Sequence, residues 1–174
     1  MAHGFSHLQR TVALRKDMHT PVISFQVTVS VRRKIKLIKK GGKLLIYGGC
    51  GPNGVFLDQS ISTLDLATMS WNTFQPNGGS CPAARAYHCS VLINRDLYVF
   101  GGRSGNTYFN DMYCLHLETM SWERITAFGQ TPSPRSGCAS SVLYSVKKEP
   151  FIIIIGGMDG TKCFNDVYVL INHF

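Results

Sequence analysis

Short apolar runs that end in a pair of glycines recur along the chain. Leu44–Tyr47, Leu97–Phe100 and Ile152–Ile155 are each followed by Gly-Gly, and the glycine pairs are 53 and 55 residues apart. The segments LDLATMSW, which ends at Trp71, and LHLETMSW, which ends at Trp122, match at six of eight positions. Self-similarity at a nearly constant spacing is typical of repeat architectures. The pattern therefore predicts about three similar structural units.

Each unit contains short segments rich in β-branched and aromatic residues. In the second unit these segments are 85–93, 97–100, 111–117 and 122–126, and Asn, Asp, Gly and Pro separate them. Such segments are typical of strands, and no convincing amphipathic helical pattern interrupts them. The pattern predicts about four antiparallel strands in each unit. Four-stranded sheets that repeat and pack on one another are the blades of a β-propeller.

The boundaries of the units follow from the same signals. Residues 23–31 alternate strictly between apolar and polar side chains, so we predict that they form the innermost strand of a first blade at 21–75. The basic segment 32–43 would be the connecting loop of that blade. The second blade is predicted at 82–128, and the third at 132–174 lacks a counterpart of the outer strand that contains Trp. Residues 1–20 form a basic leader, and disorder is one of the states that we expect for it.

The net charge of +8 is confined to the first part of the chain. Residues 1–40 hold nine Lys or Arg and one acidic residue, whereas residues 41–174 hold nine of each kind. A basic run can be a solvated loop, a nuclear-import signal, or a patch for nucleic acid or acidic lipid. We favour the solvated loop, because no aromatic residues interleave as binding of single strands would require. The basic patch consists of Arg32, Arg33, Lys34, Lys36, Lys39 and Lys40.

One ordered set of residues accompanies the glycine pairs. In the second unit, Arg-x-x-His from Arg85, an apolar strand, Gly-Gly, Asn-Asp-x-Tyr from Asn110 and a Trp follow one another. This order resembles the kelch repeat, and the likeness covers residues 44–171. The first unit departs from it at 59–62, and the third has Cys138 in place of the histidine. The resemblance implies an all-β fold of kelch-like propeller blades, with about three four-stranded antiparallel units of which the last is incomplete. The residues that it marks as structural are Gly48, Gly49, Trp71, His88, Gly101, Gly102, Asp111, Tyr113, Trp122, Gly156, Gly157, Asp166 and Tyr168. We expect both tryptophans to lie between blades.

Few residues suggest catalysis. Six cysteines without a Cys-x-x-Cys pair fit reduced thiols better than a disulfide framework or a zinc site. His88 belongs to the repeat and is expected to form structural hydrogen bonds, and Asp111 and Asp166 are expected to cap turns. We therefore expect no catalytic residue, no metal and no cofactor, and predict a protein that is not an enzyme. A propeller-type oxidase or lyase is the alternative.

The loops between strands are the predicted binding surface, because recognition residues concentrate on loops that a rigid scaffold positions. Aromatic and arginine side chains are frequent anchors of interfaces. We predict a non-catalytic interaction module, a scaffold or adaptor, that binds a client protein in the cytoplasm or nucleus; a role with nucleic acid through 32–40 is a further alternative. Every candidate also has a structural interpretation; for the two arginines that begin the inner strands, this is to brace those strands through backbone carbonyls. The candidates are Phe56, Arg85, Arg103, Asn106, Tyr108, Arg135, Asp159 and Lys162.

Three predicted blades are fewer than a closed propeller contains. Propellers typically close with 4–8 blades, and an open arc exposes sheet faces and edges. The three explanations are a half-propeller that self-associates, a fragment or shortened product of a longer propeller, and an arc completed by another chain. The missing outer strand of the last unit favours the fragment or shortened product. We expect no membrane span, because no apolar run reaches the length of about 18 residues that a span requires.

Overall fold

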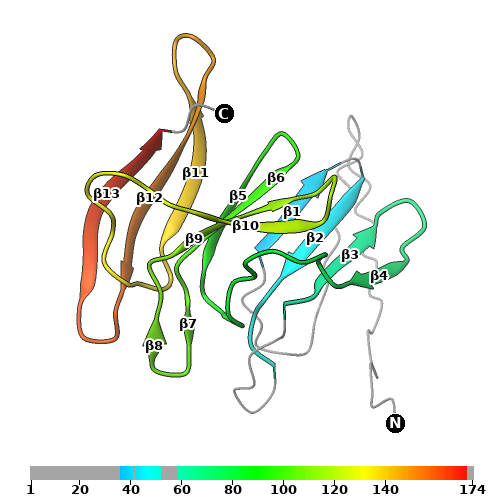
Figure 1. Ribbon diagram of the computed structural model, residues 1–174, viewed down its shortest axis with the longest axis horizontal. Coiled ribbons are helices and arrows are strands. Elements are labelled where there is room, and N and C mark those ends of the chain that lie inside the picture. Colours follow the sequence, from blue (N-terminus) through cyan, green and yellow to red (C-terminus); the bar gives the residue numbers. More distant parts are fainter. Residues whose placement is uncertain (1–35, 41, 52–58, 172–174) are drawn as a thin grey trace, which may run out of the picture.

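The computed structural model describes residues 36–40, 42–51 and 59–171, and the described part is all-β. The strands form three sheets of neighbouring antiparallel strands and one short hairpin. The predicted all-β arrangement of antiparallel blades is therefore confirmed. The sheets lie side by side in an arc that does not close (Figure 1).

The first blade contains β1 (Lys36–Lys40), β2 (Lys43–Tyr47), β3 (Ile61–Asp65) and β4 (Trp71–Phe74), paired in that order. The prediction of a loop at 32–43 is wrong for residues 36–40, because they form β1, whose Lys40 pairs with Lys43 of β2. A Gly-Gly pair joins these two lysines, and Gly42 has a φ of +75°, as two-residue hairpin turns require. Residues 23–31 and the leader lie outside the described residues. Of the basic patch, Lys36, Lys39 and Lys40 belong to β1, and Arg32, Arg33 and Lys34 are not among the described residues.

The second blade contains β5 (Cys89–Ile93), β6 (Asp96–Phe100), β9 (Met112–His116) and β10 (Ser121–Ile125), with β5 innermost and β10 outermost. A small hairpin, β7 (Arg103–Ser104) and β8 (Thr107–Tyr108), extends from the connection between β6 and β9. In the third blade, β11 (Ala139–Tyr144), β12 (Pro150–Met158) and β13 (Cys163–Ile171) form a three-stranded sheet.

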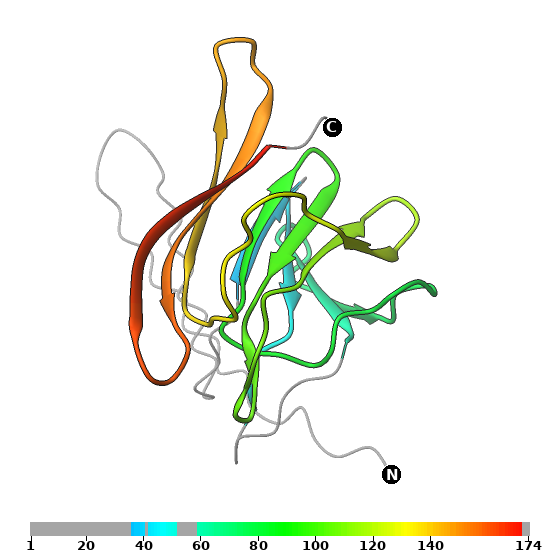
Figure 2. The same cartoon turned by 60° about the vertical axis from the view of Figure 1, so that its left-hand side comes forward.

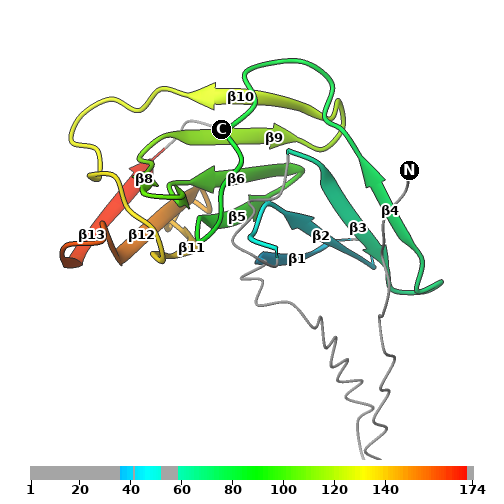
Figure 3. The same cartoon turned by 90° about the horizontal axis from the view of Figure 1, so that it is seen from below.

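The innermost strands of the three blades are neighbours, and β5 contacts both β1 and β11 (Figure 3). Because successive side chains of a strand point to opposite faces, each blade presents two apolar faces. The face of the second blade that includes Leu97 and Leu115 packs on Tyr47 and Ile61 of the first blade. Its opposite face packs on the third blade around Ile152. The core of the protein is thus two layers of side chains between blades.

The two tryptophans have different environments. Trp122 is 3% exposed and packs against Tyr47, with ring centroids 5.0 Å apart. Trp71 is 38% exposed, because no described strand packs on its side of the first blade. The expectation that both tryptophans lie between blades is therefore correct for Trp122 and wrong for Trp71 within the described structure.

Candidate functional site

A buried arginine organises the lower end of the second blade. Arg85 is 0% exposed, and its guanidinium donates to both carboxylate oxygens of Asp111, at 2.5 and 3.1 Å. It also donates to the carbonyl oxygens of Ala83 and Gly101, each at 3.0 Å, and lies 4.2 Å from the ring centroid of Phe109. A bidentate, charge-assisted pair of this kind is both strong and geometrically specific. The ion pair therefore joins the segment before β5 to the segment before β9.

The third blade repeats this arrangement. Arg135 donates to both carboxylate oxygens of Asp166 and to the carbonyl of Gly156, and lies 4.0 Å from the ring centroid of Phe164. The hydrogen bond from Arg135 holds the pKa of the Asp166 carboxyl below its usual value. Tyr113 and Tyr168, which the motif also marks, flank the guanidinium groups of their respective blades.

Two predictions about these residues need correction. Arg85 and Arg135 were candidates for binding a partner, but both are buried and brace their blades instead. Asp111 and Asp166 were expected to cap turns, but their carboxylates accept hydrogen bonds from these arginines. The sequence could not choose between these roles, because the partners are 26 and 31 residues apart in the chain.

The glycine pairs connect each blade to the next. Gly101 has a φ of +64°, and a Cβ there would lie 2.7 Å from the carbonyl oxygen of Arg135. The N–H of the adjacent Gly102 donates to the same oxygen at 2.8 Å, and Gly49 donates to Arg85 in the same way at 2.9 Å. Only glycine allows both the close approach and the positive φ. The buried arginine and the glycine pair of the preceding blade thus form one joint.

Other glycines that the kelch motif marks as structural, and His88, lie at the same joints between blades. Gly48 and Gly156 have positive φ values of 61° and 60°, and Gly157 lies against the carbonyl of Ser136 in the third blade. His88 is buried, and its ring packs on that of Tyr47 with centroids 5.2 Å apart.

Two loops come together below the second and third blades, and we call them the lower loop face. They are the β7–β8 hairpin, residues 103–108, and the connection between β12 and β13, residues 159–162 (Figure 1). Tyr108 contacts Gly160, where an added Cβ would lie 2.7 Å from the Tyr108 hydroxyl. The two loops are about fifty residues apart in sequence, and the fold brings them into contact.

Side chains hold this face in place. The guanidinium of Arg103 lies 5.0 Å from the ring centroid of Tyr87. Oδ1 of Asp159 accepts hydrogen bonds from the hydroxyl and N–H of Thr161 and from the N–H of Lys162, at 2.6 to 3.0 Å. These bonds lower the pKa of Asp159 to about 2, so its carboxylate is ionised at neutral pH. These contacts therefore order both loops, which present charged side chains.

The predicted loop candidates are thus divided. Arg103, Asn106, Tyr108, Asp159 and Lys162 belong to the lower loop face, with Asn106 and Lys162 exposed. Arg85 and Arg135 lie inside the blades, and Phe56 is outside the described residues.

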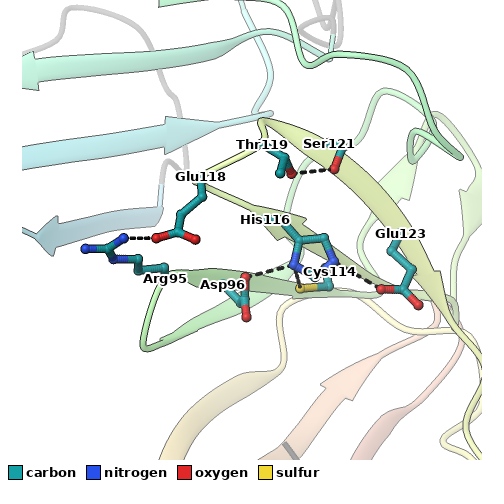
Figure 4. A network of polar contacts seen from close by, with 8 residues as sticks. All are labelled: Arg95, Asp96, Cys114, His116, Glu118, Thr119, Ser121 and Glu123. Carbon is teal, nitrogen blue, oxygen red and sulfur yellow. Dashed lines mark hydrogen bonds and ion pairs between the residues drawn. The ribbon is translucent and has the colours of Figure 1, made fainter.

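A polar network that the sequence did not predict lies on the second blade (Figure 4). Nδ1 of His116 on β9 lies 2.9 Å from a carboxylate oxygen of Asp96 on β6, and Nε2 lies 3.1 Å from one of Glu123 on β10. The hydrogen bonds to Asp96 and then to Glu123 raise the pKa of His116. The register places Asp96 opposite His116, and Glu123 opposite Cys114, two residues from His116 on the same strand. Alternation along each strand could have indicated that these polar side chains share a face, but the pairing of the three strands was needed to make them neighbours.

Part of this network contains atoms that metals accept as ligands. Asp96, Cys114 and His116 bring an oxygen, a sulfur and a nitrogen within 4.8 Å of one another. However, Nδ1 of His116 already shares a hydrogen bond with Asp96, and burial raises the pKa of the Cys114 thiol to about 12. A metal would have to break that bond and remove a tightly held proton. The arrangement therefore fits an ion-pair network better than a metal centre.

A cleft of about 390 Å³ lies at the edge of the interface between the second and third blades. Its walls include the end of β10, the chain that follows it as far as residue 132, and side chains of β13, among them Tyr168. Pockets of this size can hold small molecules. The carboxylate of Asp111 at its edge is already committed to Arg85, and Arg124 provides the other charge.

Comparison with known proteins agrees with this geometry. Residues 16–171 match the family model described as the KLHDC2/KLHL20/DRC7 Kelch-repeats domain. The chain belongs to the kelch-repeat family. The predicted family resemblance is confirmed. The Arg–Asp pairs and the glycine joints described above are formed by residues of the kelch motif.

Several curated proteins are similar to this kelch chain. Acyl-CoA-binding domain-containing protein 5 of Arabidopsis thaliana is 36% identical over 118 residues, which are 67% of this chain and 17% of that protein. Tip elongation aberrant protein 1 of Schizosaccharomyces pombe is 32% identical over 162 residues, 89% of this chain and 14% of its own length. Kelch domain-containing protein 1 of Homo sapiens is 44% identical over 80 residues, 44% of this chain and 19% of its own length. The chain therefore spans less than one fifth of each of these relatives.

The family supports a coarse description of function. Kelch-repeat domains are generally non-catalytic and serve protein–protein interaction. Among the residues that the structure describes, no helix has the length and hydrophobicity that crossing a lipid bilayer requires.

Proposed function

We propose that the lower loop face is the surface through which this kelch module binds a client protein. The observation that carries the proposal is the contact between Tyr108 and Gly160, which unites loops of two different blades into one surface. A surface that is assembled before binding loses little conformational entropy when a partner arrives.

The chemistry of the surface suggests the kind of client. Arg103 and Lys162 contribute positive charge, and Tyr87 and Tyr108 contribute aromatic area beside them. Asp159, the acidic residue of the 159–162 loop, uses its Oδ1 in internal hydrogen bonds. The client segment that fits best is therefore acidic, with apolar side chains that pack on the tyrosines.

A quantitative pull-down from cell extract tests this proposal. R103E/K162E is expected to lose the proteins that the unmodified chain captures. The control is K147E/K148E, which makes the same charge change on two exposed lysines in the turn between β11 and β12. Equal loss with both variants, or no loss with R103E/K162E, would contradict the assignment of the binding surface.

The role of the module is that of a scaffold or adaptor in the cytoplasm or nucleus. What supports this location is that all six cysteines are free thiols, as reducing compartments favour. Microscopy of the tagged chain tests it, and a signal confined to the secretory pathway would contradict it.

A further inference from the structure

The innermost strands of the second and third blades run past each other at close range. In Figure 2 they are the green β5 and the yellow-orange β11, and they are in contact. The N–H of Gly137 donates to the carbonyl oxygen of Tyr87 at 2.7 Å. Further along both segments, the hydroxyl of Ser140 donates to the carbonyl oxygen of Ser90 at 3.3 Å. The residues between these two hydrogen bonds therefore lie opposite one another.

Each segment has one cysteine between these bonds, Cys89 on the second blade and Cys138 on the third. Both side chains pack in the apolar cluster between the two blades, which also contains Ile152. The Cys89 thiol donates a hydrogen bond to the sulfur of Cys138, and this bond lowers the pKa of Cys138. Cys89 is 2% exposed, whereas Cys138 is only partly buried. A buried thiol thus lies against one that solvent can reach.

The pair arises where the third blade departs from the kelch motif. In the second blade the histidine of the motif, His88, packs on Tyr47 of the first blade. Cys138 holds the equivalent position 50 residues later, and it packs toward the second blade in the same way. The substitution brings a sulfur atom to the place where the neighbouring strand provides Cys89. The residue that distinguishes the third blade is therefore one of the two thiols.

We propose that Cys89 and Cys138 are a site of reversible oxidation, at which hydrogen peroxide converts the two thiols into a disulfide that joins the second blade to the third. First, the Cys138 sulfur attacks a peroxide oxygen and the O–O bond breaks. The sulfur becomes a sulfenic acid, and the departing hydroxide leaves as water with the Cys138 proton. Next, the Cys89 sulfur attacks the Cys138 sulfur, the S–O bond breaks, and hydroxide leaves as water with the Cys89 proton. Two thiols and one peroxide thus give one disulfide and two waters.

The environment of each thiol assigns its role. The thiolate is the nucleophile, and the hydrogen bond from Cys89 and the nearby guanidinium of Arg135 both favour the thiolate of Cys138. Cys138 is also the more exposed of the two, so it reacts with the peroxide and Cys89 resolves the sulfenic acid. A reachable thiol with a lowered pKa beside a resolving cysteine is typical of redox-sensitive sites. This proposal does not depend on the proposed client surface.

Peptide mapping of the full 174-residue chain tests the proposal. The reduced chain is treated with an equimolar amount of hydrogen peroxide, unfolded, alkylated, and cleaved after Lys and Arg. Cys89 then lies in the peptide 86–95 and Cys138 in the peptide 136–147, and neither peptide has a second cysteine. Mass spectrometry should find these two peptides joined, with the loss of two hydrogen atoms. The number of thiols that can be alkylated should fall from six to four, and dithiothreitol should restore it.

Serine variants separate the two roles. In C89S the sulfenic acid has no resolving thiol, so dimedone should label Cys138. In C138S the buried Cys89 should stay reduced. C163S is the matched control, because Cys163 is exposed and should not affect the yield of the joined peptides.

Four results would overturn the proposal. They are two thiols that stay reduced, a sulfinic or sulfonic acid at Cys138 without the cross-link, disulfides to other cysteines or between chains, and dimedone labelling of Cys89 instead of Cys138. Peptide mapping needs only the unmodified chain, so a variant that does not fold leaves the first three results decisive.

Discussion

Replacing Arg85 by methionine removes the guanidinium while keeping most of the apolar stem. The Asp111 carboxylate, which is only 17% exposed, then loses both of its hydrogen bonds from this guanidinium, and two backbone carbonyls lose theirs. Breaking a buried ion pair by removal of one partner typically costs about 3–5 kcal/mol. Loss of the contact between the guanidinium and Phe109 adds about 1 kcal/mol. We expect R85M to lower the free energy of unfolding by about 4 kcal/mol, a large part of the 5–15 kcal/mol of a typical domain.

Urea unfolding followed by tryptophan fluorescence measures this change. The comparison is R135M, which disrupts the equivalent pair of the third blade. Asp166 is twice as exposed as Asp111, at 36%, so water can solvate its carboxylate and the loss should be smaller. A loss below about 1 kcal/mol for R85M, or a larger loss for R135M than for R85M, would refute the view that burial makes these pairs structural.

Three further results are expected. The pKa of His116 is raised in the folded state by the carboxylates of β6 and β10, so this network stabilises the fold below the unfolded pKa of about 6.5 and loses its effect as pH rises through the folded pKa. Because the ring is partly exposed, the difference should stay below about 1 kcal/mol, and urea unfolding of the unmodified chain and H116Q across this range measures it. G101A should destabilise the protein by more than about 1 kcal/mol, whereas G105A, which also has positive φ but open space around it, should cost less in the same unfolding assay. Alkylation followed by mass spectrometry should modify exposed Cys163 well before Cys114, whose burial raises its thiol pKa to about 12; equal rates would contradict the structure.

Most strands were predictable because their signals are local. The apolar runs before the glycine pairs became β2, β6 and β12, and the segments after them became β3, β9 and β13. Strand β1 was missed because its lysines suggested a solvated loop. The Gly-Gly pair that follows it, placed between two runs containing apolar residues, was the hairpin signal that could have identified it.

The candidate site was predictable only in part. Composition marked eight loop residues as possible anchors but could not separate Arg103, on the lower loop face, from Arg85 and Arg135 inside the blades. All three arginines have the same chemistry, and their roles differ because Asp111 and Asp166 lie opposite two of them. The network around His116 was missed because its three residues come from three separate strands.

The sequence by itself determined the repeat, the strands and the positions of the glycine joints, because strand periodicity and the requirement for positive φ act over a few residues. Only the tertiary structure decided which charges are buried, which loops meet, and which blade faces remain open. These properties depend on contacts between residues tens of positions apart, so identical local patterns have different environments. Trp71 and Trp122 end nearly identical segments, and one is exposed while the other is buried because, among the described strands, only Trp122 has a neighbouring blade on its side.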